Sequence, residues 1–107
     1  MDVKLGPDDV AEGELRSYEL DGRWVLVTRL AGALFALDDQ CQHAGCLLSG
    51  GWLEASEVVC PCHEYSYDVR SGRNTTEPRL CGDQPRYPLR LVDGELVVEL
   101  PGPERRE

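Results

Sequence analysis

Apolar positions along the chain come in short runs that are separated by turn dipeptides. Residues 14–20 alternate in part and end at Asp21-Gly22, and residues 23–30 are rich in β-branched and aromatic side chains. Ala31-Gly32 then separates this run from residues 33–37. Short runs of this kind, joined by dipeptides that end in glycine, are typical of antiparallel hairpins. The first part of the chain therefore predicts three strands.

The second half of the chain repeats this pattern. Residues 65–69 alternate between polar and apolar and stop at Ser71-Gly72, after which residues 73–88 predict a loop that contains proline. Residues 89–92 and 95–100 flank Asp93-Gly94 and predict a closing hairpin. The residues from Pro101 onward predict a frayed tail.

Residues 38–57 have no period and are rich in glycine and cysteine. Only residues 47–57 could form a turn of helix, and Gly50-Gly51 disfavours even that. We expect an all-β fold in which small antiparallel sheets flank a loop-built lobe. The prediction is one domain, residues 1–107, with a base formed by residues 1–38 and 84–107 and an inserted lobe formed by residues 39–83.

Composition narrows the class of protein. The chain has 107 residues, 41% of them hydrophobic, which suits one compact domain. It has no run of about 20 apolar residues, and its acidic, polar start does not resemble a secretory signal, so we expect a cytoplasmic protein without a membrane span. The net charge of −9 argues against nucleic-acid binding. It suits docking onto a basic surface of a redox partner, or serves only solubility.

The candidate chemistry lies in Cys41-Gln42-His43 and Cys60-Pro61-Cys62-His63. Each segment offers a thiolate and an imidazole, and the chain has only two histidines. Two such segments can enclose a pair of iron atoms, with cysteines on one iron and histidines on the other, as in a Rieske [2Fe–2S] centre. Cys41, His43, Cys60 and His63 are therefore the predicted ligands of one [2Fe–2S] cluster that transfers single electrons.

Three other interpretations compete. A structural zinc module usually pairs like ligands from one turn, whereas each segment here mixes cysteine with histidine. A secreted disulfide scaffold leaves the histidines unexplained and disagrees with the odd count of five cysteines. A cluster-free interaction domain would not need four ligands. Iron and zinc analysis of the purified protein separates these alternatives.

Residues 41–68 resemble the two cluster-binding loops of the Rieske proteins, and the resemblance extends more weakly over the whole length. It implies a stack of small antiparallel sheets with the cluster at one tip. It also implies that Cys41 and Cys60 bind the inner iron. His43 and His63 would then bind the outer iron, with their ring edges near solvent.

The resemblance also bears on the remaining cysteines. In Rieske proteins of respiratory complexes, cysteines at the positions of Cys46 and Cys62 form a disulfide that ties the two loops together. The same bond is expected here, although spare thiols remain the alternative because reducing compartments disfavour disulfides. Cys81 matches no ligand position and is interpreted as a free thiol.

Two tyrosines are candidates for tuning the reduction potential. Tyr65 and Tyr67 lie two apart on an extended segment and so face the same way. High-potential relatives carry serine and tyrosine hydroxyls here that point at the cluster, and only Tyr67 matches. Tyr65 replaces the serine, and Glu64 replaces a usual glycine, which puts the local backbone geometry in doubt. Packing in the core is the alternative for both tyrosines.

Three other features have simpler interpretations. Asp38-Asp39 is expected either in a docking rim or at a solvated strand end. Trp24 and Trp52 are expected to pack in the core or in the lobe.

The predicted function is that of a soluble Rieske-type ferredoxin. Such a protein is a carrier, not an enzyme, and moves electrons from a reductase to an oxygenase or another acceptor enzyme. The alternative is the cluster-bearing fragment of a membrane quinol-oxidising complex, which the extra cysteine pair favours and the absence of an anchor disfavours. A structural zinc module remains the alternative from another class.

Overall fold

The structure, a computed structural model, describes residues 2–20, 22–40, 46–62, 64–76 and 84–100. Within these ranges it contains ten β-strands and one 3-10 turn. The strands of the N-terminal half are β1 (Asp2–Pro7), β2 (Leu15–Leu20), β3 (Arg23–Leu30) and β4 (Ala33–Asp38). Then follow the turn η1 (Leu48–Gly50), β5 (Trp52–Glu54), β6 (Glu57–Val59), β7 (Ser66–Asp68), β8 (Arg86–Tyr87), β9 (Leu89–Val92) and β10 (Glu95–Glu99).

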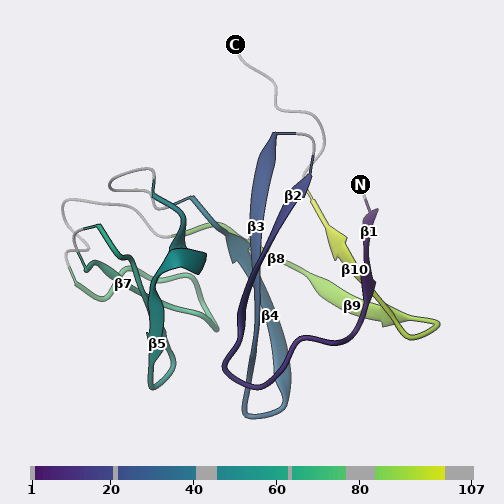
Figure 1. Ribbon diagram of the computed structural model, residues 1–107, viewed down its shortest axis with the longest axis horizontal. Helices are drawn as coiled ribbons and strands as arrows, with labels where there is room; N and C mark the ends of the chain where they lie inside the picture. Colours follow the sequence, from purple (N-terminus) through teal and green to yellow (C-terminus); the bar gives the residue numbers. More distant parts are fainter. Residues whose placement is uncertain (1, 21, 41–45, 63, 77–83, 101–107) are drawn as a thin grey trace.

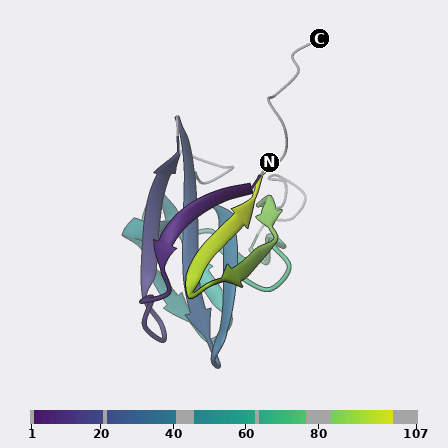
Figure 2. The same cartoon turned by 90° about the vertical axis from the view of Figure 1, so that its right-hand side faces the viewer.

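The strands form three small sheets in the orders β1-β10-β9, β2-β3-β4-β8 and β5-β6-β7, and all of their pairings are antiparallel. The four-stranded sheet lies in the middle, with β5 and β7 on one side and β1, β9 and β10 on the other (Figures 1 and 2). This arrangement confirms the predicted all-β fold of stacked small sheets. In the part of the chain that the structure describes, no helix is long and apolar enough to cross a membrane.

Strand β3 contributes to two separate cores because both faces of the middle sheet are covered. Val25 and Val27 point into the core shared with β10, whereas Leu26 points into the core shared with the β5-β6-β7 sheet. Successive side chains of a strand face opposite sides, so the part of a strand that is covered on both sides is apolar at successive positions. This explains the unbroken apolar run of residues 25–27 in β3.

The second core lies between the middle sheet and the β5-β6-β7 sheet, and we call it the lobe core. Its fully buried members come from both sheets and from the segments that join them: Leu26, Leu37, Leu48, Val58, Cys60, Tyr67 and Val69. One candidate ligand, Cys60, therefore belongs to a hydrophobic core.

Several turns form where glycine dipeptides predict them. Ala31 and Gly32 have φ angles of 54° and 82°, and Asp93 and Gly94 have φ angles of 53° and 80°. Positive φ at both central residues characterises the tight turn whose twist matches a two-stranded hairpin. The hairpins β3-β4 and β9-β10 are thus confirmed, with strand ends within one residue of the predicted ones.

Other elements were not predicted. β1 lies in the acidic start of the chain and pairs with β10, so its formation depends on a partner from the other end of the sequence. β5 and β6 form a hairpin around Ala55, whose φ of 55° is unusual for a residue other than glycine, so the turn has no glycine signal. The division into a base and a lobe at residues 39 and 83 stays a prediction.

Candidate metal centre

Asp39, two residues before Cys41, is a buried anchor of the chain. Its side chain is fully buried, and its carboxylate accepts hydrogen bonds of 2.7 Å from the backbone N–H and from the hydroxyl of Ser49. The prediction of a docking rim or a solvated strand end is therefore wrong for Asp39. The missed signal is Ser49 itself, since a serine next to a glycine pair offers two donors to one carboxylate.

The chain around Cys60 makes a tight reversal directly after β6. The backbone N–H of Cys60 donates to the Tyr65 carbonyl at 2.8 Å, and the N–H of Glu64 donates to the Cys60 carbonyl at 2.9 Å. Glu64 has a φ of 60°, which is the left-handed conformation that glycine adopts most easily. The backbone therefore needs a glycine-like residue at position 64, and the sequence places glutamate there.

Burial alternates sharply within this reversal. Cys60 is fully buried in the lobe core, whereas Pro61 and Cys62 are exposed. One cysteine of the Cys-Pro-Cys segment thus points inward and the other outward. The two cysteines therefore suit different roles. Cys60 is placed to bind a metal on the inner side, and Cys62 is placed to form a covalent bond near the surface.

That other bond is the disulfide between Cys46 and Cys62, whose Cα atoms lie 6.5 Å apart. The predicted disulfide is confirmed, and the alternative of two spare thiols is wrong for this structure. Cys46 lies three residues after His43, and Cys62 directly precedes His63. The bond therefore joins the two segments that carry the candidate ligands.

Gly51 explains the glycine pair at positions 50 and 51. A Cβ atom added to Gly51 would lie 1.8 Å from the Val59 carbonyl oxygen and 3.2 Å from Cδ of Pro61. At Gly50 the nearest such contact is an ordinary 3.7 Å to Pro61. The segment that follows η1 thus packs directly against the backbone that leads into Cys60, and only glycine allows this approach.

Both tyrosines next to the second ligand segment face the lobe core. Tyr67 in β7 is fully buried there, and Tyr65 packs against the same core while partly exposed. The expectation that they face the same way is thus confirmed. The tuning role of the Tyr67 and Tyr65 hydroxyls stays a prediction.

A third segment is tied to the second ligand segment. The backbone N–H of Ser66 donates to the Thr76 hydroxyl, and the Thr75 N–H donates to the Ser66 carbonyl, both at 2.9 Å. Farther along, the backbone N–H of Gln84 donates to the Gly72 carbonyl at 2.6 Å. The chain before and after residues 77–83 is therefore fixed to the lobe.

Cys41, His43, His63 and Cys81 lie outside the described residues, so the ligand set and the interpretation of Cys81 stay predictions. Among the residues that the structure does describe, no group of three or more histidine, cysteine, aspartate and glutamate side chains could hold a metal ion. Cys60 is the one predicted ligand whose surroundings are known.

Trp24 and Trp52 do not occupy the interior. Their exposed fractions are 36% and 41%, so the prediction that they pack in the core is wrong. Trp52 Nε1 donates to a carboxylate oxygen of Glu54 at 3.0 Å, and Trp24 helps to line a polar depression that also includes Gln40. Both indoles are therefore surface features of the protein.

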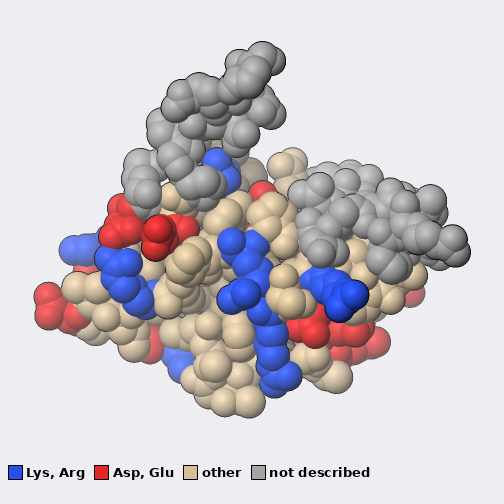
Figure 3. Space-filling view, turned by 180° about the vertical axis from the view of Figure 1, so that it is seen from behind, with Lys and Arg blue, Asp and Glu red and all other residues tan. Residues whose placement is uncertain are grey.

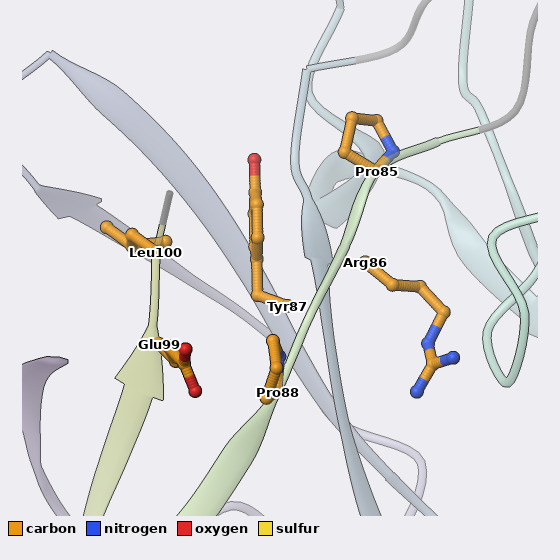
Figure 4. Close-up of a pocket in the computed structure, with 6 residues that line it drawn as sticks. All are labelled: Pro85, Arg86, Tyr87, Pro88, Glu99 and Leu100. Carbon is orange, nitrogen blue, oxygen red and sulfur yellow. The ribbon is translucent and has the colours of Figure 1, made fainter. Parts of the chain in front are cut away.

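A further depression of about 340 Å³ lies where β8 and β10 end. Tyr87 and Arg86 project to opposite sides of their strand, and Leu100 and Glu99 form the other wall (Figure 4). Burial and the neighbouring Asp38 carboxylate raise the pKa of the Tyr87 hydroxyl, and Arg23 opposes this in part.

The charge is unevenly distributed despite the acidic total. On the face opposite to that of Figure 1, lysine and arginine side chains form a band down the middle, with acidic side chains on both sides (Figure 3). Docking by charge alone would therefore depend on which face meets the partner.

Comparison with known sequences gives a consistent result. Residues 3–88 match the Rieske [2Fe-2S] domain. The ferredoxin component of biphenyl 2,3-dioxygenase from Rhodococcus jostii (strain RHA1) is 33% identical, covering 88% of this chain and 87% of the relative. The ferredoxin component of naphthalene 1,2-dioxygenase/salicylate 5-hydroxylase systems from Ralstonia sp is 28% identical, covering 87% of this chain and 88% of the relative.

A relative of another kind is the iron-sulfur subunit of the cytochrome b6-f complex from Chlorobaculum tepidum (strain ATCC 49652 / DSM 12025 / NBRC 103806 / TLS). It is 31% identical and covers 92% of this chain, but only 54% of the relative is matched.

Solved structures give the same fold. The ferredoxin of carbazole 1,9a-dioxygenase from Nocardioides aromaticivorans IC177 superposes with a TM-score of 0.80 at 29% identity, covering 91% of this chain and 95% of that one. A ferredoxin from Sphingomonas yanoikuyae B1 superposes with a TM-score of 0.83, covering 94% of this chain and 100% of that one. Its identity of 24% supports the fold alone.

Proposed function

Because this chain belongs to the Rieske [2Fe–2S] family, we propose that it is a soluble, cytoplasmic one-electron carrier that takes electrons from a reductase and delivers them to an oxygenase. The observation that carries this proposal is the match to ferredoxin components of dioxygenase systems over nearly the full length of both chains. These relatives are named as ferredoxin components, which supports the role of an electron carrier for this chain.

As a Rieske domain the chain carries one [2Fe–2S] cluster, and the described residues fit this group. The thiol of Cys60 lies in a dry core, and the Cys46–Cys62 disulfide joins the segments next to His43 and His63. We propose Cys41, His43, Cys60 and His63 as the ligands, because soft thiolates with imidazoles on the second iron are the Rieske donor set.

When bound, the cluster supplies a one-electron couple. The protein's own residues provide the surroundings: Leu26, Leu37 and Val58 exclude water from the Cys60 side chain. A dry, low-dielectric environment strengthens every nearby hydrogen bond and charge, so these residues help to set the potential. The disulfide and the hydrogen bonds within residues 60–65 hold the second ligand segment in one shape.

Metal analysis is the first test. Protein purified without added metal should contain two iron atoms per chain and no stoichiometric zinc, and His43→Ala or His63→Ala should abolish the Rieske spectrum or convert it to that of another cluster. One zinc and no iron would mean that the chain is the structural zinc module instead.

Electron delivery is the second test. Chemically reduced protein is mixed in a stopped-flow instrument with the oxidised oxygenase component of an aromatic-ring dioxygenase system, and the oxidation of the protein is followed by absorbance. The net charge of −9 predicts a second-order rate that falls as salt is added, if the oxygenase docks through a basic surface. A reduced protein that transfers no electron to such oxygenases would contradict the proposed acceptor.

The second candidate function is that of the cluster-bearing fragment of a membrane quinol-oxidising complex. The disulfide and the 31% identity to the cytochrome b6-f iron-sulfur subunit favour it. The reduction potential separates the two, because a cluster that accepts electrons from a quinol needs a potential in the upper part of the Rieske range, which extends to roughly +300 mV. A measured potential well below that value would exclude the quinol-oxidising complex, and the ferredoxin would be the remaining function.

A further inference from the structure

The backbone of residues 38–40, which leads directly into Cys41, is held by three separate parts of the chain. The N–H of Asp38 donates to the Pro85 carbonyl and the N–H of Asp39 donates to the Trp24 carbonyl, both at 2.9 Å. The Asp39 carbonyl accepts from the N–H of Leu48 at 2.7 Å.

One side chain completes this arrangement. Gln84 is only 2% exposed, and its Nε2 atom donates to the Asp38 carbonyl at 2.5 Å and to the Gln40 carbonyl at 2.9 Å. A carboxamide nitrogen has two hydrogens, so it can serve both carbonyls at once. Gln84 therefore spans the carbonyls on either side of Asp39, although it lies 44 residues from Gln40 in the sequence.

Gln84 is itself rigidly placed. Its backbone N–H donates to the Gly72 carbonyl at 2.6 Å. A Cβ atom added to Gly72, which has a φ of 79°, would lie 2.2 Å from the Gln84 carbonyl oxygen. The side chain is thus presented from a backbone that packs closely against the turn after β7.

The contact to Gln40 has a particular consequence. The Gln40 carbonyl belongs to the peptide group that joins Gln40 to Cys41, and a peptide group is planar. Fixing this oxygen therefore fixes the plane from which the Cα of Cys41 departs. The contact therefore acts on the direction of a candidate ligand through a single peptide group.

We propose that Gln84 is a positioning residue for Cys41, which presets the start of the first ligand segment before any metal is bound. This inference rests on the proposed function to the extent that Cys41 is a cluster ligand. Gln84 acts on Cys41 through the backbone of residues 38–40, where its two amide hydrogen bonds end. Its role goes beyond burying a polar group, because both of its bonds end on the peptide groups that precede the ligand.

The test compares Gln84→Met with wild-type holoprotein. Methionine keeps the length and volume of the side chain and removes both donors. Gln84→Glu keeps the shape but sets acceptor oxygens against two carbonyl oxygens. The matched control is Val98→Ala, a fully buried position in the core between β3 and β10, which is separate from the lobe core that contains Cys60. This change lowers overall stability by leaving a cavity.

Three quantities are measured on the isolated protein: the rate of iron release to a chelator, the reduction potential, and the electron paramagnetic resonance spectrum of the reduced cluster. We expect Gln84→Met to release iron roughly ten- to thirtyfold faster than wild type, the range that two lost hydrogen bonds of ordinary strength represent. Its g values should shift or broaden and its potential should change. Gln84→Glu should be affected at least as much, and Val98→Ala should keep the wild-type spectrum and potential.

A Gln84→Met protein whose spectrum, potential and iron release equal those of wild type would overturn the inference. The inference would also be overturned if Gln84→Met and Val98→Ala, compared at the same loss of stability, changed the spectrum, the potential and the rate of iron release to the same extent. If Gln84→Met does not accumulate as folded protein, Gln84→Asn, which keeps the amide on a shorter side chain, decides by the same criteria. None of these measurements includes an oxygenase. If the protein fails to reduce an oxygenase, that result contradicts the proposed acceptor and leaves the result for Gln84 unchanged.

Discussion

Cys46 and Cys62 are bonded to each other although they differ in their surroundings: Cys46 packs against the lobe core and Cys62 is exposed. The bond crosses from the segment after His43 to the residue before His63. It therefore constrains both candidate ligand segments from outside, while Cys60 remains inside. An exposed disulfide is also accessible to reducing thiols.

We expect Cys46→Ser to make the cluster less stable than Cys81→Ser does, because only the first change unties the two segments. The measurement is the half-life of the visible absorbance of the oxidised cluster in the presence of a chelator. Mass spectrometry after alkylation without reductant should label Cys81 and leave Cys46 and Cys62 unlabelled. Labelling of all three would contradict the disulfide in the isolated protein.

Tyr67→Phe should lower the reduction potential by some tens of millivolts. The change removes a hydroxyl from a fully buried residue. A lost hydrogen bond is worth about 0.5–1.5 kcal/mol, and about 1.4 kcal/mol, a tenfold change in the equilibrium, equals ~59 mV for one electron. Redox titration followed by circular dichroism measures this. Tyr65→Phe, at the partly exposed neighbour, serves as the control and should shift the potential less. Equal potentials in Tyr67→Phe and wild type would leave Tyr67 with a packing role only.

Gly51→Ala should destabilise the protein and its cluster by about 1–3 kcal/mol or more, because the added methyl group would overlap the Val59 carbonyl oxygen. Gly50→Ala is the matched control, since its nearest contact of 3.7 Å leaves room for a methyl group. Urea unfolding followed by circular dichroism compares the two. Similar unfolding midpoints for both variants would show that the loop can move away from β6.

Glu64→Gly should stabilise the protein by about 1 kcal/mol, since glycine adopts the observed φ of 60° without the cost that a side chain incurs. It should also raise the potential by an amount of the order of 10 mV, because it removes a negative charge next to His63. Ala55→Gly, at a φ of 55° in the β5-β6 turn, is the control for the backbone effect. Ala55→Gly should stabilise the protein by a similar amount and leave the reduction potential unchanged. A potential shift of equal size in both variants would show that the charge of Glu64 is not its cause.

The raised pKa of Tyr87 predicts a loss of stability in alkaline solution. The fold favours the protonated hydroxyl of Tyr87 chiefly through burial. The resulting contribution to the free energy of unfolding is fully present below the ordinary pKa of 10.0, and it is lost as the pH rises through the higher pKa of the folded state. Wild-type protein should therefore lose more unfolding free energy than Tyr87→Phe as the pH rises above about 10. Parallel pH profiles for the two proteins would exclude Tyr87 as a source of the dependence.

The sequence by itself determined the hairpin strands β3, β4, β9 and β10, and it predicted the donor set. Glycine dipeptides place the turns of β3-β4 and β9-β10 because the required positive φ is a local property of those residues. The pairing of cysteine with histidine in each of two segments restricts the metal chemistry because ligand type is local as well. These inferences needed no knowledge of the partners in space.

Only the tertiary structure decided the features that depend on contacts between distant residues. β1 needs β10 as its partner, the turn of β5-β6 has no glycine, and the burial of Asp39 follows from its bonds to Ser49. The contact of Gln84 with the Gln40 carbonyl has no sequence signal at all, since glutamine in a loop is ordinary. Side-chain amides and carboxylates acquire their roles from whichever backbone groups the fold leaves facing them, and that is decided only when the sheets are assembled.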